Sequence, residues 1–89
     1  MTFFYFYSAA LFVNGDPCPS FGTVAMDKKV VDDESFTEFT ASVKEVVVRD
    51  LFARMLPYSA MEEGDLMENI KSSPIIISNM YLLSTIEDQ

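Results

Sequence analysis

The sequence contains no histidine, one cysteine and only three glycines among its 89 residues. Without histidine it lacks the usual general base near neutral pH and the commonest ligand of transition metals. The single cysteine, Cys18, cannot form an internal disulfide and is typical of a reducing compartment, so we expect a cytoplasmic protein. Gly15, Gly22 and Gly64 are too scattered for a phosphate-binding loop. These absences predict a protein that is not an enzyme and has neither a cofactor nor a metal.

Positive charge is also scarce, because six basic residues face fourteen acidic ones and the net charge is −8. A protein that binds nucleic acid needs basic groups to replace the counterions of the phosphates, so we expect no direct contact with nucleic acid. The apolar segment 1–13 is shorter than the roughly 20 residues of a membrane-spanning helix. It also lacks the cationic start and the cleavage site of a signal peptide. We therefore expect no membrane contact and assign this segment to the folded protein.

Apolar and aromatic side chains are what the sequence does contain, at 49% and 13% of residues, which is enough for a single packed domain over 1–89. Residues 2–13 are rich in Phe and Tyr and carry no charge, which predicts a strand. Residues 14–22 contain Asn-Gly, two prolines and a further glycine, which predicts a loop. Returning and final strands are predicted at about 23–31 and 75–84.

A change of period after residue 31 predicts helix. Ser35 and Glu38 have the spacing of a capping box, and apolar residues then recur every three or four positions as far as Leu51. The main helix is expected at about 36–56, because Pro57 disfavours helical geometry in the residue before it. A second, short helix is expected at about 60–71.

These elements predict an α+β fold, with a three-stranded antiparallel sheet of order 2-1-3, the first strand central and the main helix on one face. Neither face of the first strand is polar, so the second face also needs a cover. Either the short helix or a second chain supplies it, and the sequence leaves both open. Because a buried tyrosine hydroxyl needs a polar partner, we expect the tyrosines on the uncovered face. The predicted partner-binding residues are Phe3, Tyr5, Tyr7 and Tyr81.

The aromatic run FFYFY, the turn in SFGTVAMD, the amphipathic helix and the closing IIISNMYLL resemble, in their layout, small acidic accessory proteins of phages and prophages. The resemblance covers most of the chain and rests on this layout and on the Phe21-Gly22 turn. It carries over no functional residue. It implies a non-enzymatic protein that acts by binding a host or phage protein.

Three functional hypotheses follow from these patterns. The first is a small interaction module whose aromatic sheet face binds a protein, either a different protein or a second copy in a homodimer. The second is an acidic inhibitor that mimics nucleic acid and occupies the basic groove of a DNA- or RNA-binding or defence protein. The third is a structural domain without a binding surface. The acidic residues assigned to the mimic are Asp32, Asp33, Glu34, Glu62, Glu63, Asp65 and Glu68.

Overall fold

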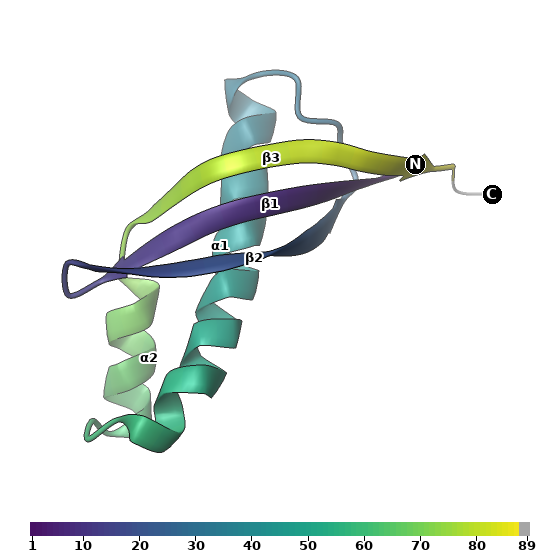
Figure 1. The fold of residues 1–89 in the computed structure, drawn as a ribbon. Coiled ribbons are helices and arrows are strands. Elements are labelled where there is room, and N and C mark those ends of the chain that lie inside the picture. The colour runs from purple at the N-terminus through teal and green to yellow at the C-terminus, as the bar shows by residue number, and fades with distance from the viewer. Residues whose placement is uncertain (88–89) are drawn as a thin grey trace.

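The computed structural model describes residues 1–87, which form one sheet and one layer of helices (Figure 1). The strand order is β2-β1-β3, and both outer strands run antiparallel to β1. The predicted α+β fold with the first strand in the centre is therefore confirmed. The elements are β1 (Thr2–Val13), β2 (Asp16–Met26), α1 (Asp33–Met55), the 3₁₀ turn η1 (Leu56–Tyr58), α2 (Glu63–Lys71) and β3 (Ile75–Ile86).

The loop predicted at 14–22 is wrong, because β2 begins directly after a two-residue turn. Asn14 and Gly15 both have positive φ, 53° and 84°, as the favoured two-residue hairpin turn requires. Val13 and Asp16, which flank the turn, form a hydrogen-bonded pair. Hydrogen-bonded and non-hydrogen-bonded pairs alternate along antiparallel strands, so the backbone nitrogens of Pro17 and Pro19 point away from β1. Since β2 is an edge strand, these prolines remove no hydrogen bond from the sheet.

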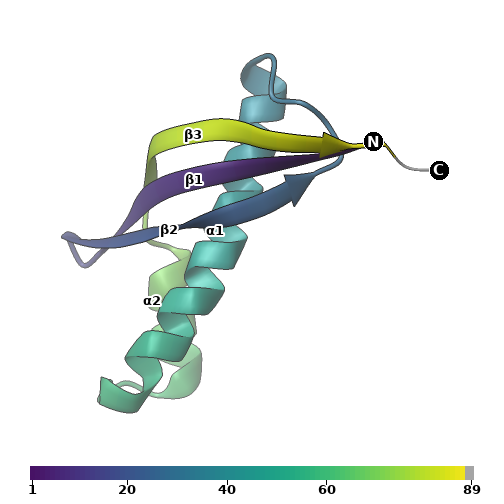
Figure 2. The ribbon, with the colours of Figure 1, turned by 45° about the vertical axis from the view of Figure 1, so that its right-hand side comes forward.

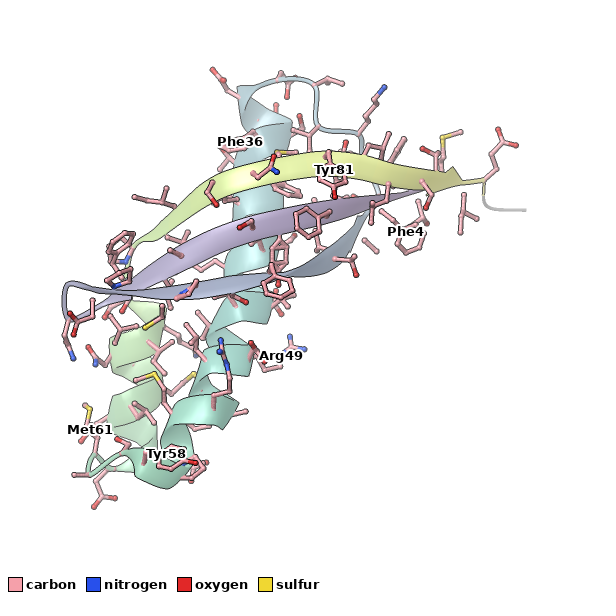
Figure 3. All side chains as sticks on the ribbon, viewed as in Figure 1. Phe4, Phe36, Arg49, Tyr58, Met61 and Tyr81 are labelled. Carbon is pink, nitrogen blue, oxygen red and sulfur yellow. The ribbon has the colours of Figure 1, made fainter. Side chains whose placement is uncertain are left out.

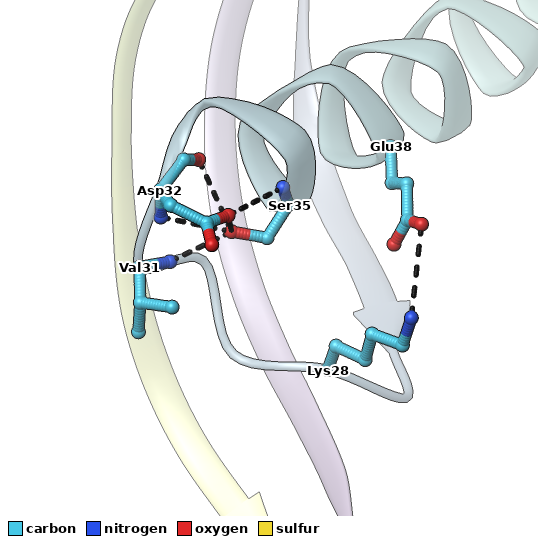
Figure 4. A network of polar contacts seen from close by, with 5 residues as sticks. All are labelled: Lys28, Val31, Asp32, Ser35 and Glu38. Carbon is cyan, nitrogen blue, oxygen red and sulfur yellow. Dashed lines mark hydrogen bonds and ion pairs between the residues drawn. The ribbon is translucent and has the colours of Figure 1, made fainter.

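Helix α1 begins earlier than predicted, and its cap is different (Figure 4). The N-cap is Asp32, whose Oδ1 accepts the backbone N–H of Ser35 at 2.8 Å. In return, Ser35 Oγ accepts the N–H groups of Val31 and Asp32, at 2.8 and 3.0 Å. The predicted capping box of Ser35 and Glu38 is therefore wrong. Glu38 instead lies 3.8 Å from the ammonium of Lys28, an exposed ion pair.

Both helices pack on the same side of the sheet (Figures 1 and 2). Leu66 and Ile70 of α2 share a single core with Phe39 and Val43 of α1 and with Leu11 of β1. No further element of the described residues crosses the opposite side of the sheet. The interpretation in which the short helix covers the second face is therefore wrong.

The pairing of β1 with β3 is irregular at two points, between Phe4 and Tyr5 and between Ser8 and Ala9. At each point β3 contains one residue more than β1, as in a β-bulge. At the second point Ser78 Oγ donates to the Ser8 carbonyl at 2.9 Å. Within residues 1–87, neither helix has the length and apolar character to cross a membrane.

Candidate interaction surface

Helix α1 covers the tyrosine-bearing side of β1. Tyr5 and Tyr7 are only 3% and 2% exposed, and the Tyr5 ring meets Phe39 edge to face at 5.3 Å. Tyr5 Oη accepts the backbone N–H of Val30 at 2.9 Å, so the linker before α1 supplies the polar partner that a buried hydroxyl needs. Phe3 is half-buried and packs against the same core. The prediction that Phe3, Tyr5 and Tyr7 line an uncovered face is therefore wrong.

The opposite side of the sheet is uncovered, and we call it the open face. It consists of the outward-pointing residues of β1, β2 and β3, which alternate with buried or half-buried ones along β1 and β2. None of these outward residues is charged, and the smaller ones are Ser, Ala, Pro, Thr and Asn. The large apolar side chains of the open face are Phe4, Phe6, Phe12, Phe21, Ile76, Tyr81 and Ile86.

Aromatic side chains from all three strands contribute to the open face. Phe6 of β1 stacks on Tyr81 of β3, with ring centroids 4.9 Å apart and planes inclined by 27°. Phe21 on β2 is 79% exposed, and Ile76 and Tyr81 on β3 are 58% and 50% exposed. Phe4 and Tyr81 lie on the viewer's side of the sheet, away from the helices (Figure 3). Of the four predicted partner-binding residues, only Tyr81 belongs to this surface.

The sequence prediction missed the phenylalanines of the open face. Phe4, Phe6 and Phe12 occur at even positions of β1 and therefore share one side of the strand. That repeat was visible in the sequence. The tyrosine hydroxyls instead favoured the odd-numbered residues of β1 as the uncovered side of the strand. Phe21 was missed because its strand was predicted to be a loop. Pro17 and Pro19, two residues apart, were the available signal for an edge strand with outward nitrogens.

The acidic residues assigned to a nucleic-acid mimic form two separate groups. Residues 32–34 lie at the start of α1, and residues 62–68 lie on and next to α2, which runs alongside the C-terminal part of α1 (Figure 1). Helix α1 has 23 residues and is about 35 Å long, and its N-terminal part lies between the two groups. A groove of about 470 Å³ beside α1 and α2 is lined by three basic side chains, Lys44, Arg49 and Lys71, together with the carboxylate of Glu45 and the apolar Ala41, Val48 and Met67. The structure therefore does not unite the seven carboxylates in one continuous surface.

Neither the described acidic and cysteine residues nor the comparisons with known proteins indicate another site. Among residues 1–87, no three acidic or cysteine side chains come together in a group that could hold a metal ion. Neither a protein-family model, nor a curated protein, nor a solved structure matches the chain.

Proposed function

We propose that this protein is a non-enzymatic interaction module that binds a protein partner through the open face. The observation that supports the proposal is a whole sheet face of uncharged, largely apolar side chains that no described part of the chain covers. Contiguous apolar patches of this size on a soluble domain mark interaction sites. The contact surface of the partner is correspondingly apolar and uncharged.

The energetics support a strongly bound partner. Full burial of one large apolar side chain stabilises a protein by roughly 1.5–3 kcal/mol. The seven large apolar side chains of the open face therefore represent a free energy comparable with the typical total stability of a small domain, about 5–15 kcal/mol. Part of this is already gained within the sheet, as in the Phe6–Tyr81 stack, but Phe21 and Ile76 are mostly exposed. Covering these side chains supplies the driving force for binding.

Other parts of the proposal come from the sequence. The absence of histidine supports a role without catalysis, and the single cysteine supports a cytoplasmic location. The layout that resembles phage and prophage accessory proteins supports a place among the proteins of mobile elements. In such a setting the protein acts by occupying a surface of its partner.

Affinity capture with three baits tests the proposed function. The baits are the wild-type chain, Phe21→Lys on the open face and Tyr58→Lys as the control, each with a tag, in cells that also contain the untagged chain. Phe21 is 79% exposed and Tyr58 is 90% exposed, so neither substitution disturbs the core. Tyr58 lies at the far end of the helical layer, away from the sheet (Figure 3).

We expect the wild-type and Tyr58→Lys baits to retain the same protein, and Phe21→Lys to lose it. The reason is that a lysine on the apolar open face would have to be desolvated in the contact without a partner charge. Retention of the same proteins by all three baits, with equal yields, would contradict a binding role for the open face.

A further inference from the structure

We infer that the partner on the open face is a second copy of this chain, with the two sheets packed face to face around a two-fold axis. The inference rests on the proposed function, since it names the occupant of the same surface. It places the helices on the outside, the two sheets in the middle and the phenylalanines of both copies in one shared core. Four observations support this arrangement.

The edges of the sheet are protected against the addition of another strand. The backbone nitrogens of Pro17 and Pro19 point away from β1 at the free edge of β2, where a further strand would need N–H donors. On the opposite edge, the extra residues Ser78 and Leu83 interrupt the regular spacing of β3. Prolines and bulges at sheet edges are devices that prevent edge-to-edge association. Association through the sheet therefore uses the open face.

The area of the open face is sufficient for a stable dimer. Strands β1 and β3 have 12 residues each and β2 has 11. At about 3.3 Å per residue and 4.8 Å between strands, the face measures about 40 by 14 Å. Two copies together would bury about 1,100 Å², above the roughly 1,000 Å² expected of a biological interface.

The charge distribution favours a self-contact at the open face. Each copy carries a net charge of −8, so most of its surface repels a second copy. The open face has no charged residue, so an isologous contact there sets no like charges opposite each other. Interfaces between transient partners are about as polar as the rest of the surface, whereas homodimer interfaces are more apolar. The apolar, uncharged composition of the open face matches that of a homodimer interface.

The shape of the open face, with small side chains between large rings, suits a self-complementary contact. Along β1, the small side chains of Ser8 and Ala10 leave a low strip between the rings of Phe6 and Phe12. A ring from the second copy can enter this strip, as side chains of two packed sheets interdigitate at a spacing of about 10 Å. Phe21 lies opposite Ser8 in the pairing of β1 with β2 and borders the same strip.

Sedimentation equilibrium of the purified chain at micromolar concentration tests the inference. We expect the wild type and Tyr58→Lys to sediment at 20.2 kDa, twice the monomer mass of 10.1 kDa, and Phe21→Lys to shift toward the monomer. Each dimer of the variant contains two substituted residues. If each substitution weakens the affinity about tenfold, the dissociation constant of the dimer rises about a hundredfold. Circular dichroism verifies that each variant is folded.

Isotope-filtered NOE spectra of a mixed labelled and unlabelled sample locate the contact. Intermolecular contacts of the Phe6 and Tyr81 rings are expected, and a dimer whose contacts lie only on the helices would overturn the inference. A wild-type monomer at all concentrations would overturn it too. The proposed function would survive that second result if the Phe21-sensitive capture of a different protein persisted, and would fail with the inference if it did not.

Discussion

Gly22 lies directly opposite Tyr7 in the pairing of β1 with β2. A Cβ at position 22 would lie 3.2 Å from Tyr7 Oη, which is tighter than most Cβ contacts, and 3.5 Å from Cζ, an ordinary van der Waals distance. Tyr7 is 2% exposed, so its ring has little space into which it can move. We therefore expect Gly22→Ala to lower the free energy of unfolding by about 1–3 kcal/mol, the usual effect of overpacking a core.

Gly64 provides a matched control for Gly22. It lies in α2, and a Cβ there would meet nothing within 4 Å. Gly64→Ala is therefore expected to raise the free energy of unfolding by about 0.4–1 kcal/mol, because it restricts the unfolded chain. Urea denaturation of both variants at one fixed protein concentration measures the two effects. Equal midpoints for Gly22→Ala and the wild type would mean that the Tyr7 ring yields without cost.

Asp32 is a second residue whose role can be tested by titration (Figure 4). The hydrogen bond from the backbone N–H of Ser35 lowers the pKa of Asp32 from its ordinary value of 3.8. The Ser35 hydroxyl and the charge of Lys28 act in the same direction. Since the folded pKa lies below the unfolded one, the unfolded state binds the proton more readily. The stabilisation is present at pH values above the unfolded pKa and is lost as the pH falls through the folded pKa.

Asp32→Asn keeps an oxygen acceptor at the cap but removes the titration. We expect wild-type stability to fall more steeply than that of Asp32→Asn as the pH is lowered from about 6 to about 2. Above pH 5 or so, the wild type is expected to be the more stable, because the negative charge also suits the helix N-terminus. Thermal denaturation across this range compares the two proteins. Parallel curves over the whole range would exclude a contribution from the Asp32 charge.

At the scale of elements, the sequence predicts the presence and order of strands and helices better than their boundaries. The apolar repeat of α1 and the aromatic run of β1 each dominate their segments and were identified correctly. Residues 16–22 were not, because proline and glycine usually interrupt strands. Whether a proline removes a hydrogen bond depends on the direction of its nitrogen in the sheet. That direction follows from the turn, and the Asn14-Gly15 pair was its local signal.

The hairpin turn yields a prediction at this scale. Gly15 has φ of 84°, a backbone conformation that residues with a Cβ adopt only at a cost. We expect Gly15→Ala to lower the free energy of unfolding by about 1–2 kcal/mol. Asn14→Gly, at the neighbouring positive-φ position, should change it by less than about 1 kcal/mol. Urea denaturation measures both, and a neutral Gly15→Ala would contradict a two-residue turn with positive φ at this position.

The choice between the two faces of the sheet could not be made from the sequence. Strict alternation along the last strand groups Tyr81 with Ile75 and Ile77, but the extra residue Ser78 moves Tyr81 to the opposite face. At this bulge the Ser78 hydroxyl donates to the carbonyl of Ser8, 70 residues away in the chain. The partner of the Tyr5 hydroxyl is likewise the N–H of Val30, which belongs to a linker. Both features are tertiary, and no local pattern encodes them.

At the scale of the whole molecule, the chain is elongated. Its Cα radius of gyration is 14.4 Å, whereas a compact chain of this length has about 12 Å. Its extents are 47 × 25 × 18 Å, with the strands and α1 crossing each other and projecting beyond the shared core (Figure 2). A single sheet under a single helical layer buries one face of the sheet and leaves the other exposed. In the dimer that we infer, two copies joined through their open faces would form a four-layer body in which each sheet is covered on both sides.

Net charge predicts how salt acts on such a dimer. Two bodies of net charge −8 repel each other, and salt screens this repulsion beyond about 8 Å at physiological ionic strength. The contact itself is apolar and insensitive to screening. We therefore expect the dissociation constant of the dimer to stay constant or to fall as NaCl is raised from about 50 to 500 mM. Sedimentation equilibrium at both concentrations measures it.

Neutralising the acidic group at residues 62–68 separates this mode of binding from mimicry of nucleic acid. The quadruple variant Glu62→Gln, Glu63→Gln, Asp65→Asn and Glu68→Gln removes half of the net negative charge of each copy. It is expected to form a dimer at least as tight as the wild type, because these side chains lie on the helical layer, away from the open face. A mimic would behave in the opposite way, since its affinity for a basic groove falls with added salt and with each lost carboxylate. Steep weakening of the self-association by salt and by the four amides would mean that charge, rather than the phenylalanines of the open face, holds the two chains together.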